Sequence, residues 1–246
     1  MRRHVFLTFA SAAFHGSMRR LLSEVCLSGA FDTYVGLTES NIPDFVAEHE
    51  QALVSERGFG YMIWKPHVIA QTLEKLDDGD ILVYSDAGSA YNIHGTRRLR
   101  TYFDKAARAE SGVVCFRLFG HTNAQWCKAD VASALDPGGE FTNERQVTSC
   151  LLVIRKCARS VAMVREWAGF VKDKAYGMFD DSESKLPNPP CFREHRHDQS
   201  VLSLLCYKHG CEMLDDETWF FRAWASHGIT CPFWALRRRS GGCRSS

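Results

Sequence analysis

An apolar run that ends in a carboxylate is the clearest chemical pattern in this chain, and it lies between Asp80 and Asn92. Ile81-Leu82-Val83-Tyr84 is apolar throughout, which predicts a central strand covered on both faces. In open α/β sheets, ligands bind outside the carboxyl ends of strands. Asp86 is therefore a candidate for holding a divalent cation, which in turn would neutralise a pyrophosphate. The alternative is that Asp86 only turns the chain or caps a helix.

A glycine-rich, aromatic segment precedes that strand, from Arg57 to Pro66. It places two glycines and the cations Arg57 and Lys65 just before an expected helix N-terminus. Because helix N-termini favour anions, the segment is a candidate cradle for phosphate and base. The glycine spacing matches neither a Walker nor a Rossmann pattern, so an aromatic packing loop is the alternative.

Polar residues are dense at His195-Arg196-His197-Asp198-Gln199-Ser200, directly before an apolar helical stretch. On an extended chain His195 and His197 share a face. Either imidazole could ligate a metal or touch a phosphate, and Asp198 and Gln199 could hydrogen-bond a sugar. The alternative is that the segment only caps the helix that follows.

A smaller cluster occurs at Gln125-Trp126-Cys127-Lys128-Ala129-Asp130. The face of Trp126 suits stacking against a sugar, and Lys128 and Asp130 offer polar contacts. Packing of Trp126 in the core explains the same pattern equally well.

The elements that must position these residues alternate between strand and helix along the chain. This alternation predicts an α/β fold with a mostly parallel central sheet flanked by helices. The expected strands are 5–10, 31–37, 81–84, 112–116 and 148–154. The expected helices are 15–28, 41–56, 65–76, 95–109, 128–135, 159–173 and 198–208, and residues 176–193 are expected to form a loop.

Composition sets the boundaries of this interpretation. The 246 residues carry a net charge of +1, which argues against binding of the domain to a polyanion such as nucleic acid. No apolar run approaches the roughly 20 residues of a membrane span. The ten cysteines contain no C-x-x-C pair, and several sit in apolar runs, so we expect reduced thiols and a cytoplasmic location.

The chain is expected to form one domain over residues 1–235, followed by a basic flexible tail over 236–246. Arg237-Arg238-Arg239 begins this tail. A disordered terminus is the main interpretation, and weak contact with an anionic membrane surface is the alternative.

Taken together, these segments resemble a family of small GT-A-type glycosyltransferases found in bacterial polysaccharide clusters and large viruses. The family pattern has a first strand ending in Thr-Phe, then G-x-G-Y-x-x-W-K-P, G-D-I-L-x-Y-x-D-A-G, W-x-K-x-D and H-R-H-D-Q-S. The matching residues are Thr8-Phe9, Gly58 to Pro66, Gly79 to Gly88, Trp126 to Asp130 and His195 to Leu205. The resemblance spans most of residues 4–215.

The resemblance implies a GT-A, Rossmann-like domain that transfers a sugar, with a hexose expected, from a nucleotide-sugar donor to a hydroxyl acceptor. A UDP-sugar is the expected donor, a glycan or lipid-linked molecule the expected acceptor, and polysaccharide biosynthesis the expected context. The implied donor-binding residues are Thr8, Phe9, Arg57, Lys65, Ser85, Ala87 and Gly88. The implied sugar and acceptor residues are Trp126, Lys128 and His195, and the implied catalytic residues are Asp198, Gln199 and Asp130.

The same resemblance places Asp86 at the metal-binding D-x-D element, but Gly88 stands where the second aspartate would be. We expect Mn²⁺ or Mg²⁺ as cofactor, with His197 as the replacement ligand. The Asp-Gln element favours retention over inversion at the anomeric carbon. A non-catalytic binder of nucleotide sugars or glycans is the alternative function, and a phosphotransferase with Asp86 as nucleophile is a third.

Overall fold

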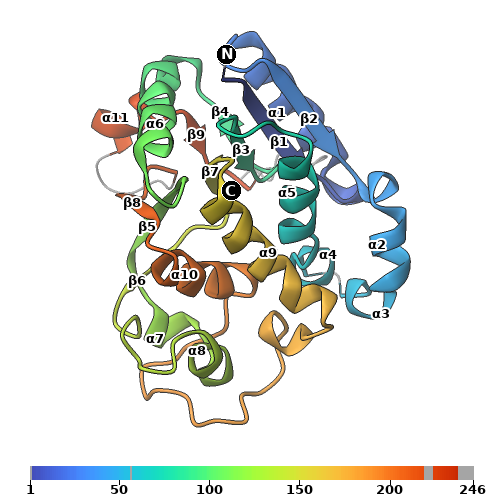
Figure 1. The fold of residues 1–246 in the computed structure, drawn as a ribbon, viewed down its shortest axis with the longest axis vertical. Coiled ribbons are helices and arrows are strands. Elements are labelled where there is room, and N and C mark those ends of the chain that lie inside the picture. Colours follow the sequence, from blue (N-terminus) through green and yellow to red (C-terminus); the bar gives the residue numbers. More distant parts are fainter. Residues whose placement is uncertain (1, 56, 219–223, 238–246) are drawn as a thin grey trace, which may run out of the picture.

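The computed structural model describes residues 2–55, 57–218 and 224–237. Its centre is a seven-stranded sheet in the order β2-β1-β3-β7-β5-β6, with β8 paired to β5 (Figure 1). Strands β1, β2, β3, β5 and β8 run in one direction, and β6 and β7 run in the other. The strands are β1 (His4–Phe9), β2 (Thr33–Leu37), β3 (Ile81–Ser85), β5 (Val113–Thr122), β6 (Arg145–Val147), β7 (Leu151–Arg155) and β8 (Glu212–Asp215). The predicted α/β fold with a mostly parallel sheet is thereby confirmed.

Helices cover both faces of the sheet because its central strands are apolar on both sides. Leu82 and Tyr84 of β3 belong to a core shared with α5 (Trp64–Glu74), α9 (Ala158–Lys172) and α10 (Asp198–Lys208). Ile81 and Val83 belong to a second core shared with α1 (His15–Leu27) and α6 (Thr96–Arg108). The alternation along β3 therefore assigns each residue to one of two layers.

The two strands that follow β1 in the chain, β2 and β3, pair with it on opposite sides. The chain passes from β1 through α1 to β2 on one side, and then returns to β3 on the other side. Open α/β sheets bind ligands at such a switch point, beyond the carboxyl ends of the two strands. Phe9 ends β1 and Ser85 ends β3, so Asp86 lies at this position.

Two sequence-based expectations differ from the structure. The predicted helix over 41–56 is divided into η2 (Glu39–Asn41), α2 (Pro43–Glu48) and α3 (Glu50–Leu53), with non-helical dihedrals at His49. Polar residues interrupt this stretch, so it lacks an apolar stripe long enough to stabilise a single continuous helix. The predicted strand near 148–154 forms β7 but runs antiparallel to β3, and periodicity gives no information on direction.

The remaining elements are short. They are η1 (Ala12–Phe14), α4 (Gly58–Tyr61), β4 (Ala90–Tyr91), η3 (Ile93–Gly95), α7 (Asn123–Trp126), α8 (Ala129–Leu135), η4 (Tyr176–Met178), α11 (Trp224–His227), η5 (Gly228–Thr230) and β9 (Phe233–Trp234). β4 and β9 form a separate antiparallel pair. The loop predicted over 176–193 contains only η4 as regular structure.

The nine cysteines within the described ranges are all free thiols, and Cys243 lies outside the described residues. None of the described helices combines the length and hydrophobicity needed to cross a membrane. Residues 238–246, most of the predicted basic tail, also lie outside the described residues.

Candidate active site

Asp86 directly follows β3 and lies in a tight turn. Its backbone N–H donates to the carbonyl of Cys150, and its own carbonyl accepts from the N–H of Ser89. This turn contains Ala87, which packs with Ala10 and Met18, and it also contains Gly88. The Asp86 side chain is 40% exposed, so the fold presents one partly accessible carboxylate at the switch point.

Lys65 lies beneath Asp86, at the first turn of α5. Its side chain is only 1% exposed, and its Nζ lies 3.2 Å from Asp86 Oδ1 and 2.6 Å from Asp198 Oδ2. Nζ also donates to the carbonyl and the hydroxyl of Ser149, each at 3.2 Å. One buried ammonium therefore joins residues from α5, the end of β3 and the start of α10.

Electrostatics keep this buried group charged. Burial acts to lower the pKa of Lys65, but the charges of Asp198 and Asp86 outweigh that effect and hold the pKa above its ordinary value. Burial raises the pKa of Asp198, and the ammonium of Lys65 partly offsets this rise. With two carboxylates and one ammonium, the cluster carries one excess negative charge when all three groups are ionised, which favours a cation at its exposed side.

The segment before α5 has an unusual backbone. Residues 58–62 all have positive φ, including Phe59 at 52°, Tyr61 at 57° and Met62 at 60°. Non-glycine residues in the left-handed region carry strain, and such strain clusters at functional sites. The turn is held by Trp64, whose indole N–H donates to the carbonyl of Gly58 and whose ring stacks on Phe9 at 4.1 Å. Phe9 at the end of β1 is thereby brought against the glycine-rich segment.

Two hydroxyls at the ends of these strands are buried without a hydrogen-bond partner among the described residues. They belong to Thr8 and Ser85, which lie on the adjacent strands β1 and β3. Unpaired buried polar atoms are uncommon in proteins, so each one calls for an explanation such as a bound ligand or water.

The two histidines have different environments. His195 donates through Nε2 to the carbonyl of Met178 and accepts at Nδ1 from the N–H of Lys128, so both ring nitrogens are used within the protein. His197 donates through Nδ1 to the carbonyl of Phe179, which leaves Nε2 as an acceptor with no hydrogen-bond partner among the described residues. His197 also has φ 52°, another left-handed residue. Burial lowers the pKa of both rings, to about 4 for His195.

Lys128 and Asp130 hold the long loop over 176–193. The ammonium of Lys128 is buried and contacts Asp180 and Ser182. The Asp130 carboxylate accepts from the backbone N–H groups of Lys185 and Leu186, at 2.8 and 2.9 Å. No described contact joins either residue to Lys65, Asp86 or Asp198, so the structure connects them to the loop.

The remaining predicted residues lie close to the start of α10. Trp126 is stacked by Arg196, whose guanidinium carbon lies 4.1 Å from the ring centroid. Gln199 donates to the side chain of Gln146. Arg57 forms an ion pair with Asp181 at 3.3 Å.

Sequence reasoning missed two residues of the central cluster. Tyr84 donates its hydroxyl to Asp86 Oδ1 at 2.6 Å, and Ser149 contacts Lys65. The strand period gave a signal for Tyr84, because residues two apart in a strand point to the same face. Ser149 approaches from a separate part of the chain, and no local pattern identifies it.

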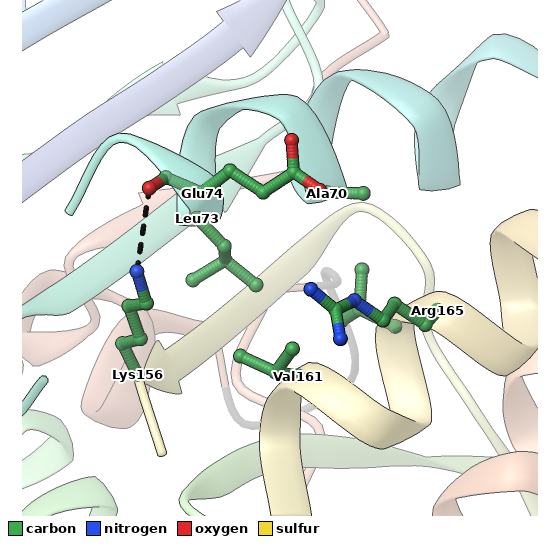
Figure 2. A pocket seen from close by; sticks show the side chains of 7 residues that line it. Ala70, Leu73, Glu74, Lys156, Val161 and Arg165 are labelled. Atoms are coloured by element: carbon green, nitrogen blue, oxygen red, sulfur yellow. Dashed lines mark hydrogen bonds between the residues drawn. The ribbon is translucent and has the colours of Figure 1, made fainter. Parts of the chain in front are cut away.

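Two cavities lie outside this cluster. One of about 150 Å³ lies between α5 and α9 (Figure 2), lined by Leu73, Glu74, Lys156 and Arg165 among others. The cavity is lined from Ala70 to Glu74 of α5, whereas Lys65 is near the start of that helix. At ~1.5 Å per residue, the lining therefore begins about 7 Å from Lys65 along the helix. The other, of about 300 Å³, lies among α7, α8 and the loop residues Pro187 and Pro189.

The residues meet the needs of a divalent cation only in part. Asp86 Oδ2 takes part in no hydrogen bond with the described residues. His197 Nε2 also has no hydrogen bond there, but the atom is buried and lies 3.8 Å from Asp181 Oδ1. Within the described ranges, however, no three His, Cys, Asp or Glu side chains come together as a metal site. Mg²⁺ commonly takes one or two carboxylates and completes its shell with phosphates and water. The protein residues therefore fit a cation that arrives with phosphate oxygens.

Comparison with known proteins places the fold. No protein-family model and no curated protein sequence matches the chain. A structure of a glycosyltransferase involved in glycosylation of the major capsid of PBCV-1 has 12% sequence identity and a TM-score of 0.54, over 99% of this chain and 94% of that chain. Mouse xyloside xylosyltransferase 1 has 13% identity and a TM-score of 0.48, over 100% of this chain and 99% of that chain. The galactosyltransferase LgtC, solved with donor and acceptor sugar analogues, has 14% identity and a TM-score of 0.43, over 90% of this chain and 77% of that chain. The likeness to the first of these structures shows the fold of this chain, which is of the GT-A type.

Proposed function

We propose that this protein is a glycosyltransferase that moves a sugar from a nucleotide-sugar donor to a hydroxyl group of an acceptor. The observation that carries the proposal is the ion-paired cluster Asp86, Lys65 and Asp198 at the switch point of the sheet. A buried lysine between two carboxylates is costly unless every charge is compensated. Its position at the site where α/β sheets bind ligands favours a role in the reaction.

The donor nucleotide is proposed to lie over the ends of β1 and β3. Phe9 and the turn before α5 form an aromatic wall there, and the unpaired hydroxyls of Thr8 and Ser85 lie at the same edge. Arg57, half-exposed beside the turn, is proposed to face the phosphates. Lys65 is enclosed by Asp86 and Asp198, so we assign it to holding the carboxylates in place.

A divalent cation, Mn²⁺ or Mg²⁺, would be held by Asp86 together with phosphate oxygens of the donor, and His197 remains the candidate second ligand. Such a cation would neutralise negative charge on the departing nucleoside diphosphate. Asp86 would hold the cation in position. Burial lowers the pKa of His197, so its ring stays neutral and Nε2 can accept.

The sugar and its acceptor are proposed to occupy the side of the cluster formed by Asp198 and Gln199, with Trp126 nearby. We propose a hexosyl transfer with retention, and a glycan or lipid-linked acceptor. Polysaccharide biosynthesis in the cytoplasm is the proposed setting.

The test is donor hydrolysis and sugar transfer across a panel of nucleotide sugars with Mn²⁺. Asp86→Asn should lower the rate at least 100-fold while the circular dichroism spectrum stays unchanged. Asp77→Asn is the matched control, because this aspartate is 86% exposed and lies before the opposite end of β3. Full activity in Asp86→Asn would contradict the proposal.

A non-catalytic binder is the second candidate, because the described residues contain no three-residue metal cluster. In that case calorimetry would show binding of nucleoside diphosphates, and no donor would be hydrolysed. Turnover of any nucleotide sugar would exclude this candidate.

A further inference from the structure

The hydroxyl of Tyr84 lies directly against the carboxylate of Asp86. Tyr84 belongs to β3, is fully buried and faces α5. Its hydroxyl donates to Asp86 Oδ1 at 2.6 Å, and Lys65 Nζ lies 3.2 Å from the same oxygen. Two donors from inside the protein therefore converge on one oxygen of the carboxylate.

The other oxygen of Asp86 is left unused by the described residues. Oδ2 takes part in no hydrogen bond with the described residues, and the side chain is 40% exposed. A carboxylate can accept about four hydrogen bonds, and here the internal ones are concentrated on Oδ1. Donors from the protein interior therefore fix the orientation of the carboxylate, and Oδ2 is left to accept from a ligand.

A second buried tyrosine provides a matched comparison within the same protein. Tyr102 on the opposite face of the sheet also donates to a carboxylate, that of Glu217. Arg98 contacts both oxygens of Glu217, so neither oxygen is left without a partner. Glu217 thus has internal partners on both oxygens, whereas the hydrogen bond from Tyr84 and the close contact with Lys65 both fall on Oδ1 of Asp86.

We infer that Tyr84 is a positioning residue that fixes Asp86 so that Oδ2 alone is presented to the donor and its cation. The part that concerns the cation rests on the proposed function. Because Gly88 supplies no second carboxylate, this single oxygen must be well oriented to contribute.

The experiment compares Tyr84→Phe with the control Tyr102→Phe, which removes an equally buried hydroxyl from a carboxylate on the other face. Phe preserves the ring in the core in both cases. In crystals of Tyr84→Phe, the Asp86 side chain should occupy more than one rotamer. Binding of Mn²⁺ in the presence of uridine diphosphate, followed by electron paramagnetic resonance, should weaken about tenfold. Tyr102→Phe should leave both readouts as in the wild type.

A crystal of the wild-type protein with Mn²⁺ and uridine diphosphate gives a second measurement that needs no variant. The cation should contact Oδ2 while Tyr84 keeps its bond to Oδ1. A cation on Oδ1, or a single wild-type rotamer of Asp86 with unchanged Mn²⁺ affinity in Tyr84→Phe, would overturn the inference. Should the wild type bind no Mn²⁺ and hydrolyse no donor, the proposed function fails, and the rotamer of Asp86 still decides the role of Tyr84.

Discussion

Lys65 and Asp198 form an ion pair at 2.6 Å in which both side chains are 1% exposed. Lys65 lies in the first turn of α5 and Asp198 is the first residue of α10, so the pair connects the starts of two helices on the same face of the sheet. The partly exposed carboxylate of Asp86 contacts the ammonium of Lys65 in this pair. One buried ammonium group therefore connects the stability of the fold to the proposed active site.

Replacing Lys65 with Met should lower the free energy of unfolding by roughly 3–5 kcal/mol, because it leaves a buried carboxylate without its cation. The double variant Lys65→Met/Asp198→Asn removes both charges and should recover much of the loss. Urea unfolding of the two single variants and the double variant measures the coupling. Additive losses would show that the pair contributes no interaction energy.

Acid should destabilise the protein through His195. Its pKa is about 4 in the folded protein and about 6.5 when unfolded, so the unfolded state binds the proton first as pH falls. The contribution of the neutral ring is complete above pH 6.5 and is lost between 6.5 and 4, by roughly 3 kcal/mol in all. Chemical unfolding from pH 7.5 to 4 should show a smaller slope in His195→Asn. An identical slope would mean that His195 is not the group responsible.

Gly60 and Gly210 both have positive φ but differ in the space around them. A Cβ on Gly60 would lie 2.8 Å from Leu53 and 2.9 Å from the carbonyl of Ala52, whereas Gly210 has nothing within 4 Å. Gly210→Ala should cost about 1 kcal/mol from the backbone alone. Gly60→Ala should cost more and should also disturb the turn before Lys65. Thermal unfolding compares the two, and equal losses would contradict the expected clash.

Asp130→Ala should release the loop near Lys185, because its carboxylate accepts two backbone N–H groups there. Hydrogen exchange of residues 184–186 should become faster, with a global loss of about 1–2 kcal/mol at most. Donor hydrolysis without acceptor should be nearly unchanged if Asp130 acts only on the loop. A loss of hydrolysis as large as that of Asp86→Asn would instead place Asp130 in the chemistry.

Local sequence patterns predicted most of the elements that matter for the site. Clear local patterns predicted the apolar strand that ends just before Asp86, the helix with Lys65 and Pro66 in its first turn, and the helix beginning at Asp198. These signals are local, because they depend on residues within one or two turns of each other. The prediction of one continuous helix over 41–56 was wrong, because the apolar pattern is weakest there.

The sequence by itself determined that Asp86 and Asp198 lie at element ends, where side chains can meet a ligand. Only the tertiary structure decided that Lys65 lies buried between them and that Tyr84 donates to one oxygen of Asp86. It also decided that both ring nitrogens of His195 form hydrogen bonds within the protein. The physical reason is that a charged or polar side chain is satisfied by partners far away in the chain. Strand order and direction choose those partners, and a local pattern contains neither.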